Sequence, residues 1–453
     1  MSYCTAAIER FTTAWARGTR GSDLRIRLAN GAFWSLAGTV VAQSANLVSS
    51  IAIARSLGRT GFGELAAVQS TIGLFGVLAG VSLGLTASRY VGMLRSRDPE
   101  RAGRVILLTE LISLIFAALF SSVLFLLAPA LAARTLNAPH LAHALRVACA
   151  LLTVNSLTAA QSGSLAGLEA FRTIAGVNFV RGTLTLPLVI VGTKLGGLPG
   201  TLWGLSIAGA TCWILAWFGL AARCRVMEVP LRLEIRRSDL EILWEFSLPA
   251  LISGSLAAPA TWLTNAILLN QPGGYAQMGM FNAANQWRIA IAFLPGVLWQ
   301  TFFPILSNMG GDPTAQQSYR RMIDLVAVLM LALAAAVALP LSLMAGWILP
   351  LYGPGFIEGR PIFTVVAGAS VVMAVDSAAG CALGSAGKMW ALTGFTVGWG
   401  VLLVFCSVIL IPRHLALGLA LSWFLAYALE GTLRALYVFR ANRCSIEPAS
   451  VEA

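Results

Sequence analysis

Three arginines stand inside long apolar runs of this sequence. Arg288 lies in NAANQWRIAIAFLPG, Arg181 in NFVRGTLTLP and Arg146 in HALRVACALL. If such runs cross a lipid bilayer, a charged side chain within them is costly and marks a functional site by default. The planar guanidinium can bind phosphate or carboxylate through two parallel hydrogen bonds. These positions therefore predict anion binding within the apolar part of the protein.

Arg288 is the strongest of these candidates. It follows the start of its run at residue 276 by about 12 residues, which is roughly 18 Å along a helix. Asn285 is one helical turn away and extends the polar face, and Trp287 is adjacent. A structural alternative stays open, in which Arg288 forms an internal ion pair with Asp376.

Besides Arg288, three arginines are weaker candidates for binding the same anion. Arg181 is expected roughly 12 Å from the cytosolic end of its run, where it could receive an anionic group. Arg146 is expected near the outer end of its run, and Arg89 is the last residue of a run that ends on the cytosolic side. A long arginine side chain can also extend to the membrane interface, so an anchoring role is open for all three.

Three carboxylates could bind an ion within the apolar part of the protein. Asp376 lies deep in an apolar run, in AVDSAAG. Glu110 and Asp324 occupy corresponding places in two other runs, separated by close to 213 residues. A proton or sodium ion could bind at Asp376, and pairing with Arg288 is the alternative.

The composition indicates a membrane protein. Hydrophobic residues make up 57% and charged residues 11% of the 453 residues, against about 25% charged residues in soluble domains. Long uninterrupted apolar runs predict helices rather than a barrel. The seven scattered cysteines form no CxxC pair, so no disulfide framework, metal site or cofactor is expected.

The fold class predicted is an all-α integral membrane protein with about twelve transmembrane helices. The expected spans are 30–54, 64–89, 105–131, 144–168, 173–193, 199–221, 243–269, 276–304, 322–348, 361–384, 389–411 and 415–438. They define a basic cytosolic tail at 1–29, an N-terminal lobe at 30–222, a cytosolic linker at 223–242, a C-terminal lobe at 243–438 and a cytosolic tail at 439–453.

Basic residues set the orientation of these spans. With the N-terminus inside, 22 of the 31 lysines and arginines fall on the cytosolic side and six on the outer side. This asymmetry predicts that both termini are cytoplasmic. It also accounts for most of the net charge of +12 without a nucleic-acid partner.

Two halves of the chain share one layout. The Gly-rich break ARSLGRTGFGELAAVQS recurs as NQPGGYAQMGMFNAANQ, and Gly61-Phe62 aligns with Gly274-Tyr275 at an offset of 213. The same offset maps the other span starts of the first half onto the second. Parallel repeats of this kind predict two six-helix lobes around a central cavity at their interface.

Residues 30–92 resemble the N-terminal half of polysaccharide-biosynthesis flippases, in the superfamily that also contains multidrug extruders and lipid II flippases. ARSLG, then GFG, then a Gly-rich second span ending in SRY carry the resemblance. Lipid II flippases have fourteen spans, against the twelve expected here.

The resemblance implies a non-enzymatic transporter of the bacterial inner membrane. Its cargo would be a polyprenyl diphosphate-linked oligosaccharide, moved from the cytosolic to the outer leaflet by alternating access. Arg288, Arg181, Arg146, Arg89 and Asn285 would line the cationic path, and Trp287 could stack on a sugar. Membrane lipids, and glycan polymerases or glycosyltransferases, would be its other partners.

Two other functions stay open from the sequence. A multidrug extruder of the same superfamily would favour buried carboxylates, because its cargo is commonly cationic. A non-transporting scaffold for a glycan synthesis complex would need no arginine inside the membrane.

Overall fold

The computed structural model describes residues 22–81, 83–232, 257–309, 316–385 and 389–444, and within these ranges every regular element is helical. The first half contains α2 (Ser22–Gly76), a π-helix (Val77–Val81), α3 (Leu83–Leu94), α4 (Pro99–Ala130), a second π-helix (Leu131–Thr135), α5 (Leu141–Gly167) and α6 (Phe171–Val226). The second half contains α9 (Ala257–Leu269), α10 (Gly274–Met309), α11 (Gln316–Leu343), α12 (Ala345–Ile348), two 3₁₀ turns (Leu349–Tyr352, Phe356–Gly359), α13 (Arg360–Ser385) and α14 (Met389–Cys444).

Three of these helices are hairpins of two spans. The 56 residues of α6 would extend roughly 84 Å if straight, against a hydrocarbon core of about 30 Å. The chain reverses at Gly58 in α2, where φ is 70°, at Gly196-Gly197 in α6, and at Leu415 in α14. Positive φ is favourable for glycine because it has no Cβ. The kinks at Gly58 and Gly196-Gly197 fall between the predicted spans, whereas the kink at Leu415 coincides with the first residue of the span predicted at 415–438.

Within the described ranges, seven continuous helical stretches are long and apolar enough to cross a membrane. Counting the three hairpins as two spans each and adding α9 and α10 gives the twelve predicted spans. Only the second half of the span predicted at 243–269 is described, as α9. The all-helical membrane fold is confirmed.

The span predicted as continuous over 64–89 is interrupted. The π-helix Val77–Val81 and Gly80, with φ of 101°, separate the end of α2 from α3. Gly84, after the break, packs tightly on α5, because a Cβ at Gly163 would lie 2.0 Å from the Gly84 carbonyl oxygen. Gly76, Gly80 and Gly84 recur every four residues in the sequence, but only the packing selects which of them breaks the helix.

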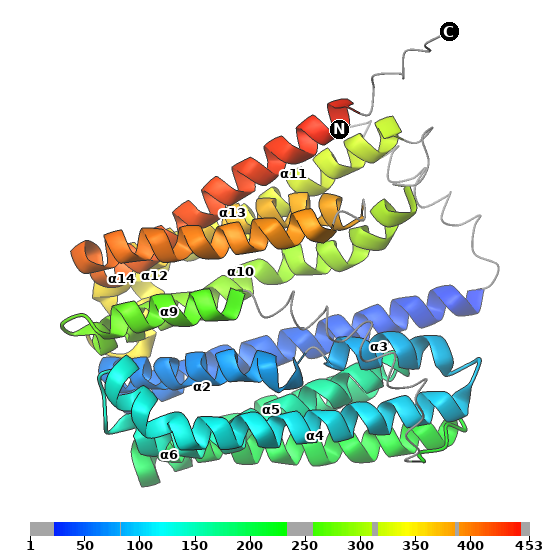
Figure 1. Ribbon diagram of the computed structural model, residues 1–453, viewed down its shortest axis with the longest axis horizontal. Coiled ribbons are helices and arrows are strands. Elements are labelled where there is room, and N and C mark those ends of the chain that lie inside the picture. Colours follow the sequence, from blue (N-terminus) through cyan, green and yellow to red (C-terminus); the bar gives the residue numbers. More distant parts are fainter. Residues whose placement is uncertain (1–21, 82, 233–256, 310–315, 386–388, 445–453) are drawn as a thin grey trace.

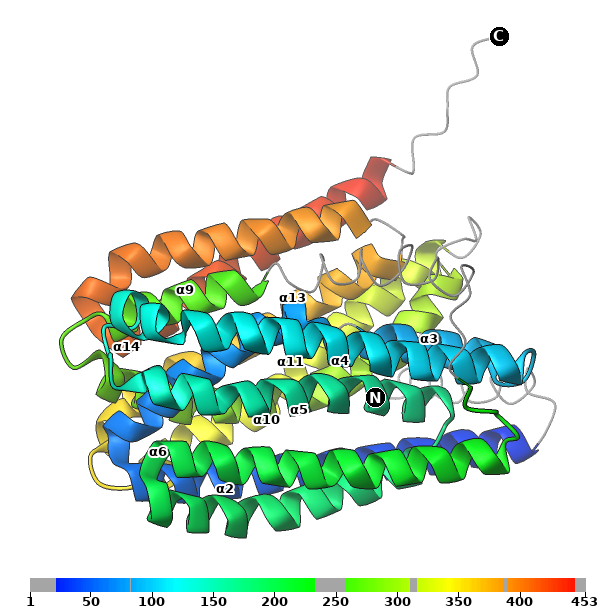
Figure 2. The same cartoon turned by 60° about the horizontal axis from the view of Figure 1, so that its bottom comes forward.

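The two halves of the chain form two lobes. Helices α2 to α6 occupy the lower part of Figure 1, and α9 to α14 occupy the upper part. In Figure 2, α4, α5 and α6 run side by side, as their mutual packing requires. The start of α2 and the end of α14 lie toward the same end of the molecule, on the right in Figure 1. An even number of membrane crossings returns the chain to the side on which it started.

The predicted tails and linker are covered only in part. Residues 22–29 of the tail at 1–29 already belong to α2, and α6 extends to Val226 within the linker at 223–242. At the C-terminus, α14 continues to Cys444. Residues 1–21, 233–242 and 445–453 lie outside the described ranges, and the cytosolic placement of all three segments stays a prediction.

Candidate functional site

Arg288 lies inside the C-terminal lobe, on α10. Its Nε donates to Asn285 Oδ1 at 2.6 Å, and Nη1 contacts Met373 Sδ of α13 at 3.6 Å. Its guanidinium carbon stands 5.0 Å from the centre of the Trp423 ring of α14. These partners are neutral, and no carboxylate of the described chain pairs with Arg288. The side chain is half-buried and points into its own lobe, so its charge is available to an anion.

Trp287, next to Arg288, is held by the protein itself. Its indole nitrogen donates to the Tyr352 hydroxyl at 3.1 Å, and its ring packs at 6.3 Å from that of Phe363. Tyr352 is also 3.5 Å from Ser50 of α2, across the lobe interface. Trp287 therefore connects the anion-binding candidate to the contact between lobes.

Asp376 pairs with Arg434 rather than with Arg288. Nη1 of Arg434 donates to Asp376 Oδ2 at 2.9 Å, and Nη2 donates to Glu430, one turn earlier on α14. All three side chains are at most 8% exposed. Two glycines make room for the group: a Cβ at Gly380 would lie 3.2 Å from Arg434 Nη1, and one at Gly431 would lie 3.3 Å from Asp376 Cβ. The alternative of an Arg288–Asp376 pair is wrong.

The sequence interpretation missed the role of Arg434, which was counted among the cytosolic anchors. A signal for it exists, because Glu430 and Arg434 are spaced i,i+4 inside the last apolar run, in YALEGTLRALY. The three groups together carry two carboxylates for one guanidinium.

Arg181 lies in the other lobe and lines a small pocket between α5 and α6. The pocket is also bordered by Thr158, Ser162, Asn178 and Cys212. The structure does not bring Arg181 and Arg288 into contact, since each faces the interior of its own lobe. The anion-binding role of both residues stays a prediction.

The remaining two arginines are exposed. Arg146 stands on α5 with its guanidinium carbon 5.1 Å from the Phe125 ring of α4. Arg89 stands on α3, 5.8 Å from the ring of its neighbour Tyr90. Neither is joined to Arg288 by the described contacts.

The two corresponding carboxylates differ in environment. Oε1 of Glu110 on α4 is buried and has no hydrogen-bond partner among the described residues, whereas Asp324 on α11 is exposed. Equivalent positions in the repeat therefore do not share one environment. The coupling role of Asp376, Glu110 and Asp324 stays a prediction.

Several contacts join the lobes at the end opposite the described chain termini. Arg59 on α2 donates to the Gly355 carbonyl at 3.3 Å and pairs with Glu358 at 2.7 Å. Arg55 donates to the Leu351 carbonyl at 2.5 Å, and Asn270 and Tyr275 each donate to a carbonyl of residues 135–136 at 2.7 Å. We call these contacts the outer latch, because the charge asymmetry predicts that this end faces outward.

Helices α2 and α10 cross at the outer latch through two glycines. A Cβ at Gly63 would lie 1.8 Å from the Tyr275 carbonyl oxygen, and one at Gly279 would lie 2.1 Å from that of Arg59. This crossing lies where the Gly-rich break recurs in the sequence. The recurrent break thus supplies a close contact between lobes as well as two tight turns.

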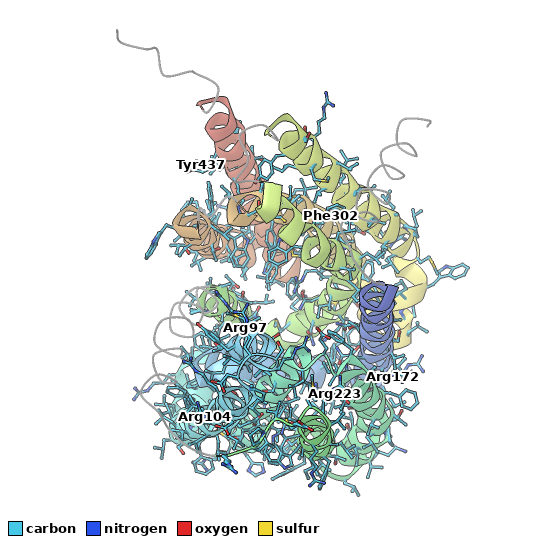
Figure 3. The ribbon with its side chains drawn as sticks, turned by 90° about the vertical axis from the view of Figure 1, so that its right-hand side faces the viewer. Arg97, Arg104, Arg172, Arg223, Phe302 and Tyr437 are labelled. Carbon is cyan, nitrogen blue, oxygen red and sulfur yellow. The ribbon has the colours of Figure 1, made fainter. Side chains whose placement is uncertain are left out.

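The opposite end of the N-terminal lobe is rich in arginine. Figure 3 faces this end and shows Arg104, Arg172 and Arg223 on helices of the first half and Arg97 in the turn between α3 and α4, with Phe302 and Tyr437 on the second half. Arg104 is buried in that lobe. That this end faces the cytosol stays a prediction from the positive-inside rule.

Residues 28–310 match the family model described as polysaccharide biosynthesis protein. The chain belongs to this family. Its relatives include the EPS I polysaccharide export inner membrane proteins EpsE of Ralstonia nicotianae and Ralstonia solanacearum. The first is 25% identical over 82% of this chain and 84% of its own length, and the second is 24% identical over 88% and 91%.

This member of the polysaccharide biosynthesis family also shares its fold with solved transporters. One is a multidrug resistance MATE family transporter of the MOP superfamily in its inward-facing conformation, with a TM-score of 0.77. It is 15% identical, and the match covers 92% of this chain and all of that one. The likeness confirms the two-lobe transporter fold.

Proposed function

We propose that the protein moves a polyprenyl diphosphate-linked oligosaccharide from the cytosolic to the outer leaflet of the bacterial inner membrane. The observation that carries the proposal is Arg288, an arginine inside the C-terminal lobe that has only neutral partners among the described residues. A diphosphate supplies the counter-charge, and the guanidinium matches its geometry. The names of the EpsE relatives support a polysaccharide cargo.

Alternating access is the mechanism that suits this arrangement. The outer latch holds the lobes together at one end through Arg55, Arg59 and Tyr275. A state closed outside would admit cargo from the cytosol, and opening the latch would release it. Polymerases or glycosyltransferases acting on the same glycan would be partners, and both termini would be cytoplasmic.

The two rival functions are less well supported. An extruder of cationic drugs needs a carboxylate facing its cargo. Asp376 and Glu430 are both engaged by Arg434, which leaves Glu110 of α4 as the buried carboxylate for that function among the described residues. A scaffold without transport activity gives no reason for the position of Arg288, because a charge within the membrane is costly.

The experiment compares Arg288→Gln with Arg413→Gln, a change at an exposed arginine in the loop of the α14 hairpin. In cells lacking the wild-type protein, Arg288→Gln should lower the surface glycan at least about tenfold, the effect of losing a charge-assisted hydrogen bond. Lipid-linked glycan should accumulate on the cytosolic leaflet while protein abundance holds. Normal surface glycan with Arg288→Gln would reject the role of this arginine, and strong sensitisation of the deletion strain to lipophilic cations would favour an extruder.

A further inference from the structure

Two tryptophans of α14 have buried indole N–H groups without an acceptor in the described chain. Nε1 of Trp399 and Nε1 of Trp423 make no hydrogen bond, although the side chains are only 6% and 7% exposed. A buried indole usually finds a partner, because an unpaired donor has lost its hydrogen bond to water. Trp262 and Trp287 do so, donating at 3.1 Å to Thr71 and Tyr352. The two unpaired donors therefore point to an acceptor that a ligand supplies.

The two tryptophans belong to one cluster. Their ring centres are 5.9 Å apart with an edge-to-face geometry of 87°, and the Tyr427 ring lies 5.2 Å from Trp399 and 6.0 Å from Trp423. We call these three residues the aromatic cluster. The kink at Leu415 makes it possible, since it folds the two arms of α14 against each other.

The aromatic cluster adjoins the candidate anion site. The Arg288 guanidinium carbon is 5.0 Å from the centre of the Trp423 ring, and the Asn285 amide is bonded to Arg288. Guanidinium, two indole donors and three ring surfaces thus meet inside one lobe. An anion at Arg288 would bring whatever is bonded to it against the aromatic cluster.

A sugar fits this combination of groups. Its hydroxyl and carbonyl oxygens accept hydrogen bonds, and an indole N–H can only donate. The C–H faces of a sugar ring are apolar and gain from contact with aromatic surfaces shielded from water. In a lipid diphosphate-linked glycan, the first sugar is joined to the terminal phosphate through a single oxygen. It therefore lies within one sugar-ring width of the phosphate.

We propose that the aromatic cluster binds the first sugar of the cargo, with Trp399 and Trp423 donating to its oxygens while Arg288 holds the diphosphate. This proposal rests on the proposed function, because it takes the anion to be the diphosphate of a glycan-linked lipid. The C-terminal lobe then distinguishes a loaded lipid carrier from a bare one. Such discrimination would keep the unloaded carrier from being transported in place of cargo.

The test measures binding of two probes to the purified full-length protein. One probe is undecaprenyl diphosphate, and the other is the same lipid carrying a single N-acetylglucosamine. Trp399→Phe and Trp423→Phe remove the N–H donors and retain an aromatic ring. Each should weaken binding of the sugar-bearing probe about tenfold, the usual effect of one lost hydrogen bond to a buried donor. Binding of the bare lipid should be unchanged with Trp399→Phe and should fall less than that of the sugar-bearing probe with Trp423→Phe, whose ring contacts Arg288. Trp203→Phe, at a tryptophan that is 51% exposed, is the matched control.

The ratio of the two affinities decides the proposal, because a loss of folded protein would affect both probes equally. Equal affinity of wild type for the two probes, or an unchanged ratio in both tryptophan variants, would overturn the sugar site. Arg288→Gln should weaken both probes. If wild type binds neither probe, the proposed function itself fails.

Discussion

Arg434 of α14 and Asp376 of α13 form a buried ion pair 2.9 Å long, and Glu430 contacts the same guanidinium. The pair joins α14, the last helix of the C-terminal lobe, to α13. Oδ1 of Asp376, Oε2 of Glu430 and Nε of Arg434 have no partner in the described part of the chain. The group is thus incompletely satisfied, which makes its balance of charges sensitive to mutation.

Removal of Arg434 should destabilise the protein more than removal of Asp376. Arg434→Gln leaves two buried carboxylates side by side and should lower the free energy of unfolding by about 3–5 kcal/mol. Asp376→Asn should cost less, because Arg434 keeps Glu430. Unfolding of each purified variant in detergent measures the loss in its free energy of unfolding relative to wild type. The control is Asp324→Asn, at an exposed site, and equal losses for the two buried variants would contradict the cluster.

Gly63→Ala should open the outer latch. Its new Cβ would lie 1.8 Å from the Tyr275 carbonyl, which forces α2 and α10 apart. Gly73→Ala, on the same helix with nothing within 4 Å, is the control. A cysteine introduced at Ser50, in a variant without native cysteines, reports the change through labelling by an impermeant maleimide added outside. Faster labelling is expected with Gly63→Ala only, and equal rates in both variants would exclude a closed latch at this crossing.

The Arg59–Glu358 pair should stabilise the closed latch modestly. Its side chains are 33% and 64% exposed, and such pairs contribute about 0.2–1 kcal/mol, so Arg59→Glu should raise Ser50 cysteine labelling by about threefold. The double exchange of Arg59→Glu with Glu358→Arg should bring the rate back toward that of wild type, apart from the loss of the hydrogen bond from Arg59 to the Gly355 carbonyl. A double variant that labels like the single one would show that the charges do not act on each other.

Arg181 should require its positive charge. Arg181→Lys retains the charge in the pocket beside Thr158 and Asn178, whereas Arg181→Gln does not. Export of glycan should fall about tenfold with glutamine and less with lysine, because lysine binds phosphate as a point charge without the planar fork. Surface glycan measured at equal protein abundance tests this order. Equal activity of the two variants would assign Arg181 to anchoring.

Much of the fold was predictable from the sequence. Apolar runs, the charge asymmetry and the offset of 213 residues are local or statistical features, and they predicted the helices, their number and the two lobes. The loops were harder. The chain turns within one or two residues at Gly58, Gly197 and Leu415. The connections that were expected to be loops between two spans are therefore kinks within continuous helices.

The candidate site was predictable only in part. Arg288 could be found because a charge in a long apolar run is rare, and Asn285 because it lies one turn away. The pairing of Asp376 with Arg434 could not be predicted from the sequence, since the two residues are 58 positions apart. Arg288 and Arg434 both lie in long apolar runs, so the sequence pattern does not say which of them pairs with Asp376. The aromatic cluster gave no signal, because tryptophans are common at membrane interfaces.

The sequence by itself determined that this chain is a two-lobe bundle of membrane helices with arginines inside it, because solvation by lipid depends on composition and span length. Only the tertiary structure decided which charges neutralise one another. Ion pairing depends on which helix faces pack together, and that choice left Arg434 bound to Asp376 and Arg288 with neutral partners beside Trp423.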